Sequence, residues 1–149
     1  MRTAMLWVVL ASASCATVSK PDLDELKPAV EAFHQRLRWK DFRGGADLIV
    51  PERRDSFLKA RARLKDDKDL YITDFQLEDA RTSPDQSVAR TVARLSWYRL
   101  PSTIEESAVV TNVFAWREGA WLLESQDSGP FEELRPAPAK LVPPPRKPQ

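Results

Sequence analysis

The first part of the chain has apolar residues at helical spacing. These positions are Leu23, Leu26, Val30, Phe33 and Leu37. Steps of three and four residues place them on one face of a helix. Pro28 falls in the first turn, where a helix tolerates proline. The pattern predicts a helix from about Leu26 to Lys40, a break at Gly44-Gly45, and a short apolar segment over 46–50.

A second helix is predicted to begin at Pro51. Proline suits the first helical position, and the acidic Glu52 follows it at the positive end of the helix dipole. Apolar positions continue through Phe57 and Leu64, with arginines and lysines interleaved on the remaining surface. Asp66-Asp67 is expected to end this helix.

After Asp69 the pattern changes to strands. Segments rich in β-branched and aromatic residues cover 70–80, 87–100, 107–116 and 120–125. Residues 83–86 (Ser-Pro-Asp-Gln) form a turn cluster, and Gly119 suits a hairpin turn. Along the second strand, one side carries Ala89, Thr91, Ala93, Leu95 and Trp97. Helices followed by four strands predict an α+β fold, with N-terminal helices packed on a curved four-stranded antiparallel sheet.

This order of elements resembles the nuclear transport factor 2-like (cystatin-like) superfamily. The resemblance spans roughly residues 25–128. It is carried by Phe33 and Leu37, Ala46-Asp47-Leu48 leading into Pro51-Glu52, Ile72-Thr73-Asp74-Phe75, and Phe114-x-Trp116 before Gly119-x-Trp121. It implies a cone-like domain with a cavity between helix and sheet.

Residues 1–14 have the layout of a signal peptide. Arg2 gives a positive start, Ala4 to Ala11 form a short apolar run, and small residues follow. The run is shorter than the roughly 20 residues that span a membrane. Cys15, the single cysteine, stands directly after the small residues, so the segment resembles the lipobox of bacterial lipoproteins, with Ser12 where that family usually has Leu. The resemblance implies cleavage before Cys15 and lipid on its thiol.

Two other interpretations of this segment stay open. Ala11-Ser12-Ala13 also fits the cleavage site of a freely secreted protein, and an uncleaved N-terminal anchor is the third alternative. A secreted protein has little use for an unpaired cysteine at its cut site, which favours the lipoprotein. Ala16 after the anchor cysteine, by the sorting rule familiar from enteric lipoproteins, favours the outer membrane, facing the periplasm.

The rest of the chain divides into three parts. Residues 15–24 are expected to be a lipidated tether, residues 25–134 the α+β domain, and residues 135–149 a proline-rich tail. The tail holds six prolines in 15 residues, which cannot build a core and favour extended polyproline II conformation. A passive tail and a partner-docking tail both fit.

Two parts of the chain carry opposite excesses of charge, although the net charge of the whole chain is small. Residues 36–68 carry 11 Lys/Arg against 6 Asp/Glu, and residues 69–133 carry 5 Arg against 12 Asp/Glu. The overall formal charge of +1 argues against a nucleic-acid partner. Solvent-exposed faces of opposite charge explain the asymmetry between the two segments. The more specific alternative is a basic helix that contacts anionic lipid or an acidic partner.

Few residues suggest chemistry. One His and one Cys exclude tetrahedral nitrogen and sulfur metal sites, and no cofactor motif is present. The candidate cavity or ligand contacts are His34, Asp74, Trp97 and Trp116. His34 could act as a general base at a cavity mouth, although it lacks a predicted carboxylate to orient it. The tryptophans are most simply core residues, or rings that stack an apolar ligand.

The sequence therefore favours a membrane-anchored envelope lipoprotein with a non-enzymatic interaction or assembly domain. Its partners are the membrane, through the lipid, and an envelope protein. The alternative is a domain that holds a small apolar ligand or lipid in a cone-shaped cavity, and an enzyme that uses His34 is the third hypothesis.

Overall fold

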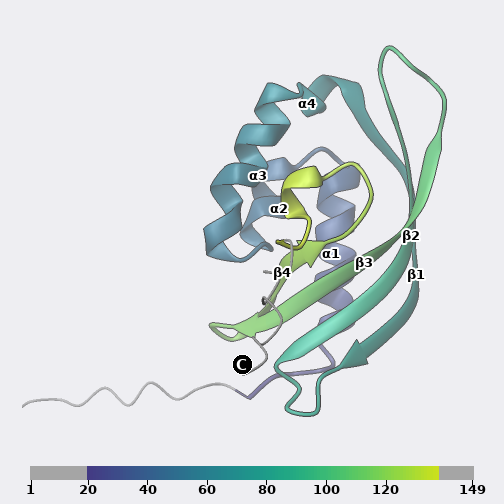
Figure 1. Ribbon diagram of the computed structural model, residues 1–149. Helices are drawn as coiled ribbons and strands as arrows, with labels where there is room; N and C mark the ends of the chain where they lie inside the picture. Colours follow the sequence, from purple (N-terminus) through teal and green to yellow (C-terminus); the bar gives the residue numbers. More distant parts are fainter. Residues whose placement is uncertain (1–19, 138–149) are drawn as a thin grey trace, which may run out of the picture.

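A computed structural model describes residues 20–137 of the chain. Its fold is α+β, with helices packed against an open antiparallel sheet of four strands in the order β1-β2-β3-β4 (Figure 1). The helices are α1 (Leu26–Arg38), α2 (Phe42–Asp47), α3 (Pro51–Arg63) and α4 (Asp66–Asp69). The strands are β1 (Leu70–Thr82), β2 (Val88–Arg99), β3 (Glu106–Arg117) and β4 (Ala120–Gln126), and a short 3-10 helix, η1, covers Glu132–Leu134. The predicted general fold class and all four strands are confirmed.

Helix α1 follows the predicted pattern. Its buried residues include Val30, Phe33 and Leu37, which recur along one face. They pack against the inward side of the sheet, where Leu95, Val110 and Phe114 are fully buried. The helix therefore covers the sheet with the stripe that the sequence indicated, and the side chains of both layers form one core.

The predicted break at Gly44-Gly45 is wrong, because both glycines lie inside α2. Asp41 caps this helix: its carboxylate accepts the Gly44 N–H at 2.9 Å. A β-carbon on Gly45 would stand 3.0 Å from the Leu37 side chain, so glycine lets α2 pack closely on α1. A cap and a close helix contact thus outweigh the weak intrinsic helix preference of glycine.

Helix α3 begins at Pro51 as predicted and ends at Arg63. Lys65 then adopts a left-handed conformation (φ 54°), and Asp66 and Asp67 begin the short α4 instead of ending α3. The predicted helix end at Asp66-Asp67 is therefore late by a few residues. Asp66 is fully buried. Its charged sequence neighbours, Lys65 and Asp67, gave no sign of this burial.

The two outer edges of the sheet differ. Beside β4, the Leu123 N–H donates to Leu48 O at 2.8 Å and the Val50 N–H donates to Leu123 O at 2.9 Å. The segment after α2 therefore covers the β4 edge in a short parallel bridge with Ile49. Strand β1 pairs with β2 alone among the described residues, so its other edge is open.

Candidate functional site

A groove lies between α1 and the open edge of β1. Its volume is about 920 Å³. The helix contributes Lys27, Glu31, Ala32, His34, Gln35 and Arg38, and the strand contributes the consecutive residues 75–80. Side chains alternate between the two faces of a strand, so a hollow on one face would be lined by every second residue. Six consecutive lining residues show that the groove follows the strand edge.

Two ring contacts align the walls of this groove. The imidazole of His34 stacks on the Phe75 ring with centroids 3.7 Å apart. Further along, the Lys40 ammonium lies 3.5 Å from the centre of the Tyr71 ring. Helix and strand therefore run in opposite directions, with the C-terminal end of α1 beside the start of β1.

His34 connects the groove to a buried group of polar side chains. Asn112 occupies the centre of this group: its carbonyl accepts from Gln126 Nε2 at 2.7 Å, and its Nδ2 donates to Thr91 Oγ1 at 3.3 Å. The same Nδ2 lies 3.5 Å from His34 Nε2. The four side chains come from α1, β2, β3 and β4, and each is at most 2% exposed. We call them the buried polar cluster.

The buried polar cluster holds the His34 ring in place from the side of the sheet. Asn112 Nδ2 lies 3.5 Å from His34 Nε2, and Gln126 fixes Asn112 from its other side. The second ring nitrogen, Nδ1, is buried and has no hydrogen-bond partner within residues 20–137. His34 is therefore a buried residue beneath the groove, with Phe75 stacked on its ring.

Burial keeps this imidazole neutral. Removal from water lowers the pKa of His34 from 6.5 to about 3. At neutral pH a group with so low a pKa is a weak base and carries no charge. It is therefore poorly suited to proton transfer.

The four sequence-predicted contacts do not meet in one cavity. Asp74 is exposed on β1 and does not line the groove. Trp97 is 8% exposed and lines a separate hollow of about 680 Å³ with Arg99 and Glu106. Trp116 is half-buried and makes an edge contact with Trp121, with ring centroids 5.5 Å apart. Of the four, only His34 lies in the groove.

Sequence reasoning missed Asn112, Gln126 and Phe75. A signal for Asn112 existed, because it stands between apolar residues at an inward-facing position of a strand, as Thr91 does in β2. Buried polar residues at such positions need partners from other elements. Those partners come from α1 and β4, and only the folded chain brings them together.

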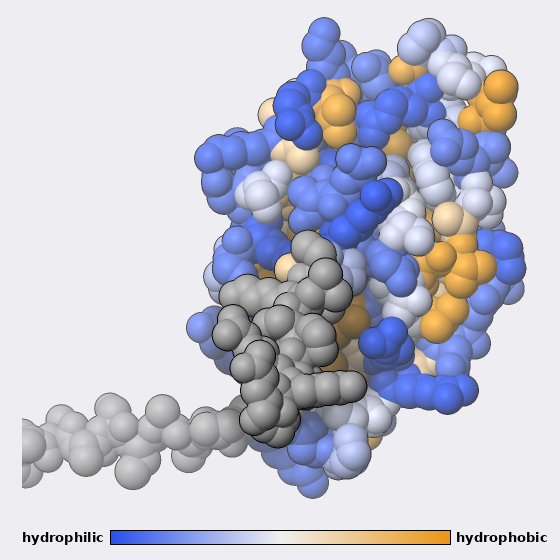
Figure 2. All heavy atoms as spheres, viewed as in Figure 1, coloured by the Kyte–Doolittle hydropathy of each residue, from blue (hydrophilic) through white to orange (hydrophobic). Residues whose placement is uncertain are grey.

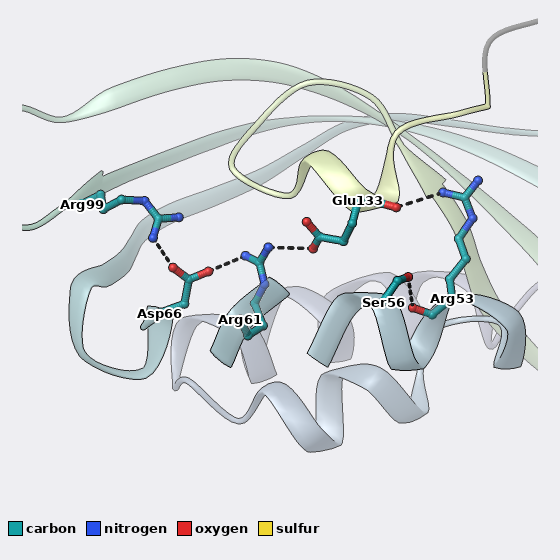
Figure 3. Close-up of polar contacts among 6 residues, drawn as sticks. All are labelled: Arg53, Ser56, Arg61, Asp66, Arg99 and Glu133. Atoms are coloured by element: carbon teal, nitrogen blue, oxygen red, sulfur yellow. Dashed lines mark hydrogen bonds and ion pairs between the residues drawn. The ribbon is translucent and has the colours of Figure 1, made fainter. Parts of the chain in front are cut away.

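A second polar cluster has a structural role (Figure 3). Arg61 and Asp66 are 3% and 0% exposed and lie 2.6 Å apart, while Arg61 also meets Glu133 at 2.7 Å and Asp66 pairs with Arg99. Burial raises the pKa of Glu133 and lowers that of Arg61, and the ion pairing opposes both shifts. These contacts join α3, α4, β2 and η1. Arg53 adds a hydrogen bond of 2.9 Å to Arg135 O, which helps to hold the segment after β4 against α3.

The remaining surface has few other features that suggest a site. The face shown in Figure 2 is mainly hydrophilic, with hydrophobic side chains gathered in small patches. Within residues 20–137, no group of three acidic, His or Cys side chains is arranged to hold a metal ion. No helix in the same range is long and apolar enough to cross a membrane. Cys15 and most of the proline-rich tail lie outside the described residues.

Comparisons with known proteins inform the fold alone. No protein-family model matches the sequence, and no curated protein matches it. The fold is similar to the solution structure of a SEC-C motif containing protein from Rhodopseudomonas palustris, with a TM-score of 0.56 and 17% sequence identity. The similarity covers 70% of this chain and 79% of the other.

Proposed function

We propose that this protein is a lipid-anchored, non-enzymatic interaction module of the bacterial cell envelope. Lipid on Cys15 would hold it to the periplasmic face of the outer membrane, and residues 25–134 would bind a partner protein in the groove between α1 and β1. The observation that carries the proposal is the open edge of β1, which forms one wall of a groove while the β4 edge is covered. Open strand edges are sites where polypeptides pair.

The filled interior favours a protein partner over a small apolar ligand. Phe33, Phe57, Phe114 and Phe131 are fully buried between the layers, so large side chains occupy the space where an enclosed ligand would sit. The groove is lined by charged and polar side chains as much as by apolar ones. Such mixed lining suits a polypeptide better than a lipid tail.

Two features of His34 favour a binding role over catalysis. Its pKa of about 3 makes it a weak base, and no carboxylate among residues 20–137 hydrogen-bonds to its ring. General bases work best with a pKa near the operating pH and with a group that orients them. Both features argue against His34 as a general base.

The proposed anchor would place one end of the domain next to the membrane. Trp121 Nε1 donates to Asp22 O at 2.6 Å, which holds the segment before α1 against the turn between β3 and β4. Six residues lie between Cys15 and Asp22, and the seven steps of a fully extended chain reach about 25 Å. The N-terminal end of α1 would then stay near the bilayer, and the groove would run away from it.

We also propose that the domain belongs to the nuclear transport factor 2-like superfamily. The succession of helices before a four-stranded antiparallel meander supports this assignment, as does a helix lying along the sheet (Figure 1). The superfamily holds both enzymes and non-enzymatic members, so the assignment leaves the function to be argued from the groove.

The test is crosslinking in intact cells followed by capture of the full-length protein. Ala32 lines the groove from α1, and Ala32→Trp fills it; the matched control is Ala62→Trp, on an exposed position of α3. An envelope protein captured by the wild type and by the control, but lost with Ala32→Trp and with Cys15→Ser, supports the proposal. Equal capture by all four forms, or capture by none, contradicts it.

The same experiment examines the alternatives. Deletion of residues 138–149 should leave capture unchanged if the groove is the binding site; loss of capture would assign the role to the proline-rich tail. A saturable change in tryptophan fluorescence with apolar probes, abolished by Trp97 or Trp116 substitutions, would favour a ligand-binding cavity.

A further inference from the structure

We propose that the groove between α1 and β1 binds an extended polypeptide segment of about five residues, which pairs with β1 as a fifth strand and places an acidic side chain at Arg38. This inference rests on the proposed function and adds the conformation and chemistry of the partner segment. Addition of a strand to an open sheet edge is an established mode of peptide recognition, with backbone hydrogen bonds that supply affinity and neighbouring side chains that supply specificity.

The dimensions of the groove fit such a segment. From Lys27 to Arg38 the helix rises about 16 Å at 1.5 Å per residue, and residues 75–80 of β1 extend about as far at 3.3 Å per residue. A paired strand matches the spacing of its neighbour, so about five residues would fill the length. Helix α1 forms the second wall of the groove.

Arg38 supplies the charge preference. It is exposed, lines the groove, and forms no ion pair within the described range. Arg38 is the last residue of α1, and this end of the helix lies beside the start of β1. The acidic side chain would therefore lie at the end of the bound segment nearest the start of β1.

The acidic residues at the other end of the groove say less about the charge of the bound segment. Glu31, Glu78 and Asp79 line this end, and each already has a cationic neighbour, at 3.7, 3.1 and 2.9 Å respectively. Exposed pairs of this kind contribute little and exchange readily. The charge of the partner segment is therefore specified mainly at Arg38.

Two other occupants fit the groove less well. A second copy of the chain would bring its own α1 alongside the shared strand pair, and that helix would compete for the space of the groove. The proline-rich tail holds six prolines in 15 residues, and prolines lack the N–H that strand pairing requires. A segment of another protein remains the best match.

The test uses a random 12-residue peptide library displayed on phage and selected on the full-length protein in detergent micelles. Selected peptides are then synthesised, and their sites are mapped by hydrogen exchange of the protein amides. We expect acidic, proline-poor peptides that protect amides within 74–80. Ala32→Trp and Arg38→Glu should each weaken binding at least about tenfold, and Ala62→Trp should leave it unchanged.

The outcomes separate this inference from the proposed function. Peptides that slow hydrogen exchange at another surface would overturn the inference and leave the proposed interaction module with a different binding site. Two candidates for such a surface are the exposed side chains Trp39 and Ile104. Failure to select any peptide would also overturn the inference, while cellular capture that depends on Ala32 would still support a folded partner in the groove. Peptides bound to 74–80 without a requirement for acid would remove the role of Arg38.

Discussion

Acidification should remove a contribution to stability that comes from His34. His34 is the single histidine of the chain, and burial lowers its pKa from 6.5 to about 3. Between these two values the unfolded chain binds a proton at His34 and the folded chain does not. The contribution of His34 to the free energy of unfolding therefore falls as the pH drops below 6.5, and this loss levels off near pH 3.

The size of this effect follows from the two pKa values. Each pH unit below the unfolded pKa costs about 1.36 kcal/mol, so a change from about pH 7.5 to about pH 5 removes about 2 kcal/mol. Burial raises the pKa of Glu133, which acts in the opposite direction, because the folded state then binds a proton more readily than the unfolded state. A comparison with His34→Gln, which keeps Glu133, cancels that contribution.

Urea unfolding followed by tryptophan fluorescence measures both free energies. The wild type should lose about 2 kcal/mol between the two pH values, and His34→Gln should lose well under half of that. Equal losses in the two proteins would refute the reasoning, as would a wild type whose stability does not change. In an NMR titration the imidazole signals should show no protonation until the pH approaches that at which the fold is lost.

Three further predictions follow from the same contacts. Asp66→Asn should lower the free energy of unfolding, measured in urea, by about 3 kcal/mol, because it leaves the buried Arg61 with Glu133 as its one carboxylate partner. The control Asp67→Asn, at an exposed neighbouring position, should change the free energy of unfolding little. Similar values for the two variants would show that the buried ion pair is not intact. Phe75→Ala should open His34 to water and raise its pKa toward 6.5 by NMR, and an unchanged value would mean that the stacked ring does not shield it. Cys15→Ser should move the protein from the membrane fraction to the soluble fraction. Mass spectrometry of the wild type should find acyl chains on the N-terminal cysteine. A Cys15→Ser variant that stays in the membrane fraction would argue for another anchor.

Periodicity in the sequence was enough to predict the main elements. The stripe through Val30 and Phe33 placed α1, and alternation along residues 88–99 placed the buried face of β2. These features arise from local spacing, so a single sequence displays them. The glycines of α2 were misjudged, because their helix is stabilised by the Asp41 cap and by contact with Leu37, which periodicity does not report.

The candidate site was harder to predict, because it is formed by pairing between distant elements. His34 was singled out from the sequence, but its partner Asn112 lies 78 residues away. The open edge of β1 depends on the strand order and on which segment covers the β4 edge, and neither is written in the local pattern. Asp74 and Trp116 were chosen for their residue types on predicted strands, and the fold places both outside the groove.

The most direct test of the central proposal is site-specific photocrosslinking in intact cells. A photoreactive amino acid at Gln76, which lines the groove on β1, is compared with one at Arg90, an exposed position of β2 that does not line it. The account predicts a discrete crosslink to an envelope protein from position 76, lost when Ala32→Trp fills the groove, and none from position 90. A partner that crosslinks from position 90 and not from position 76 would contradict it.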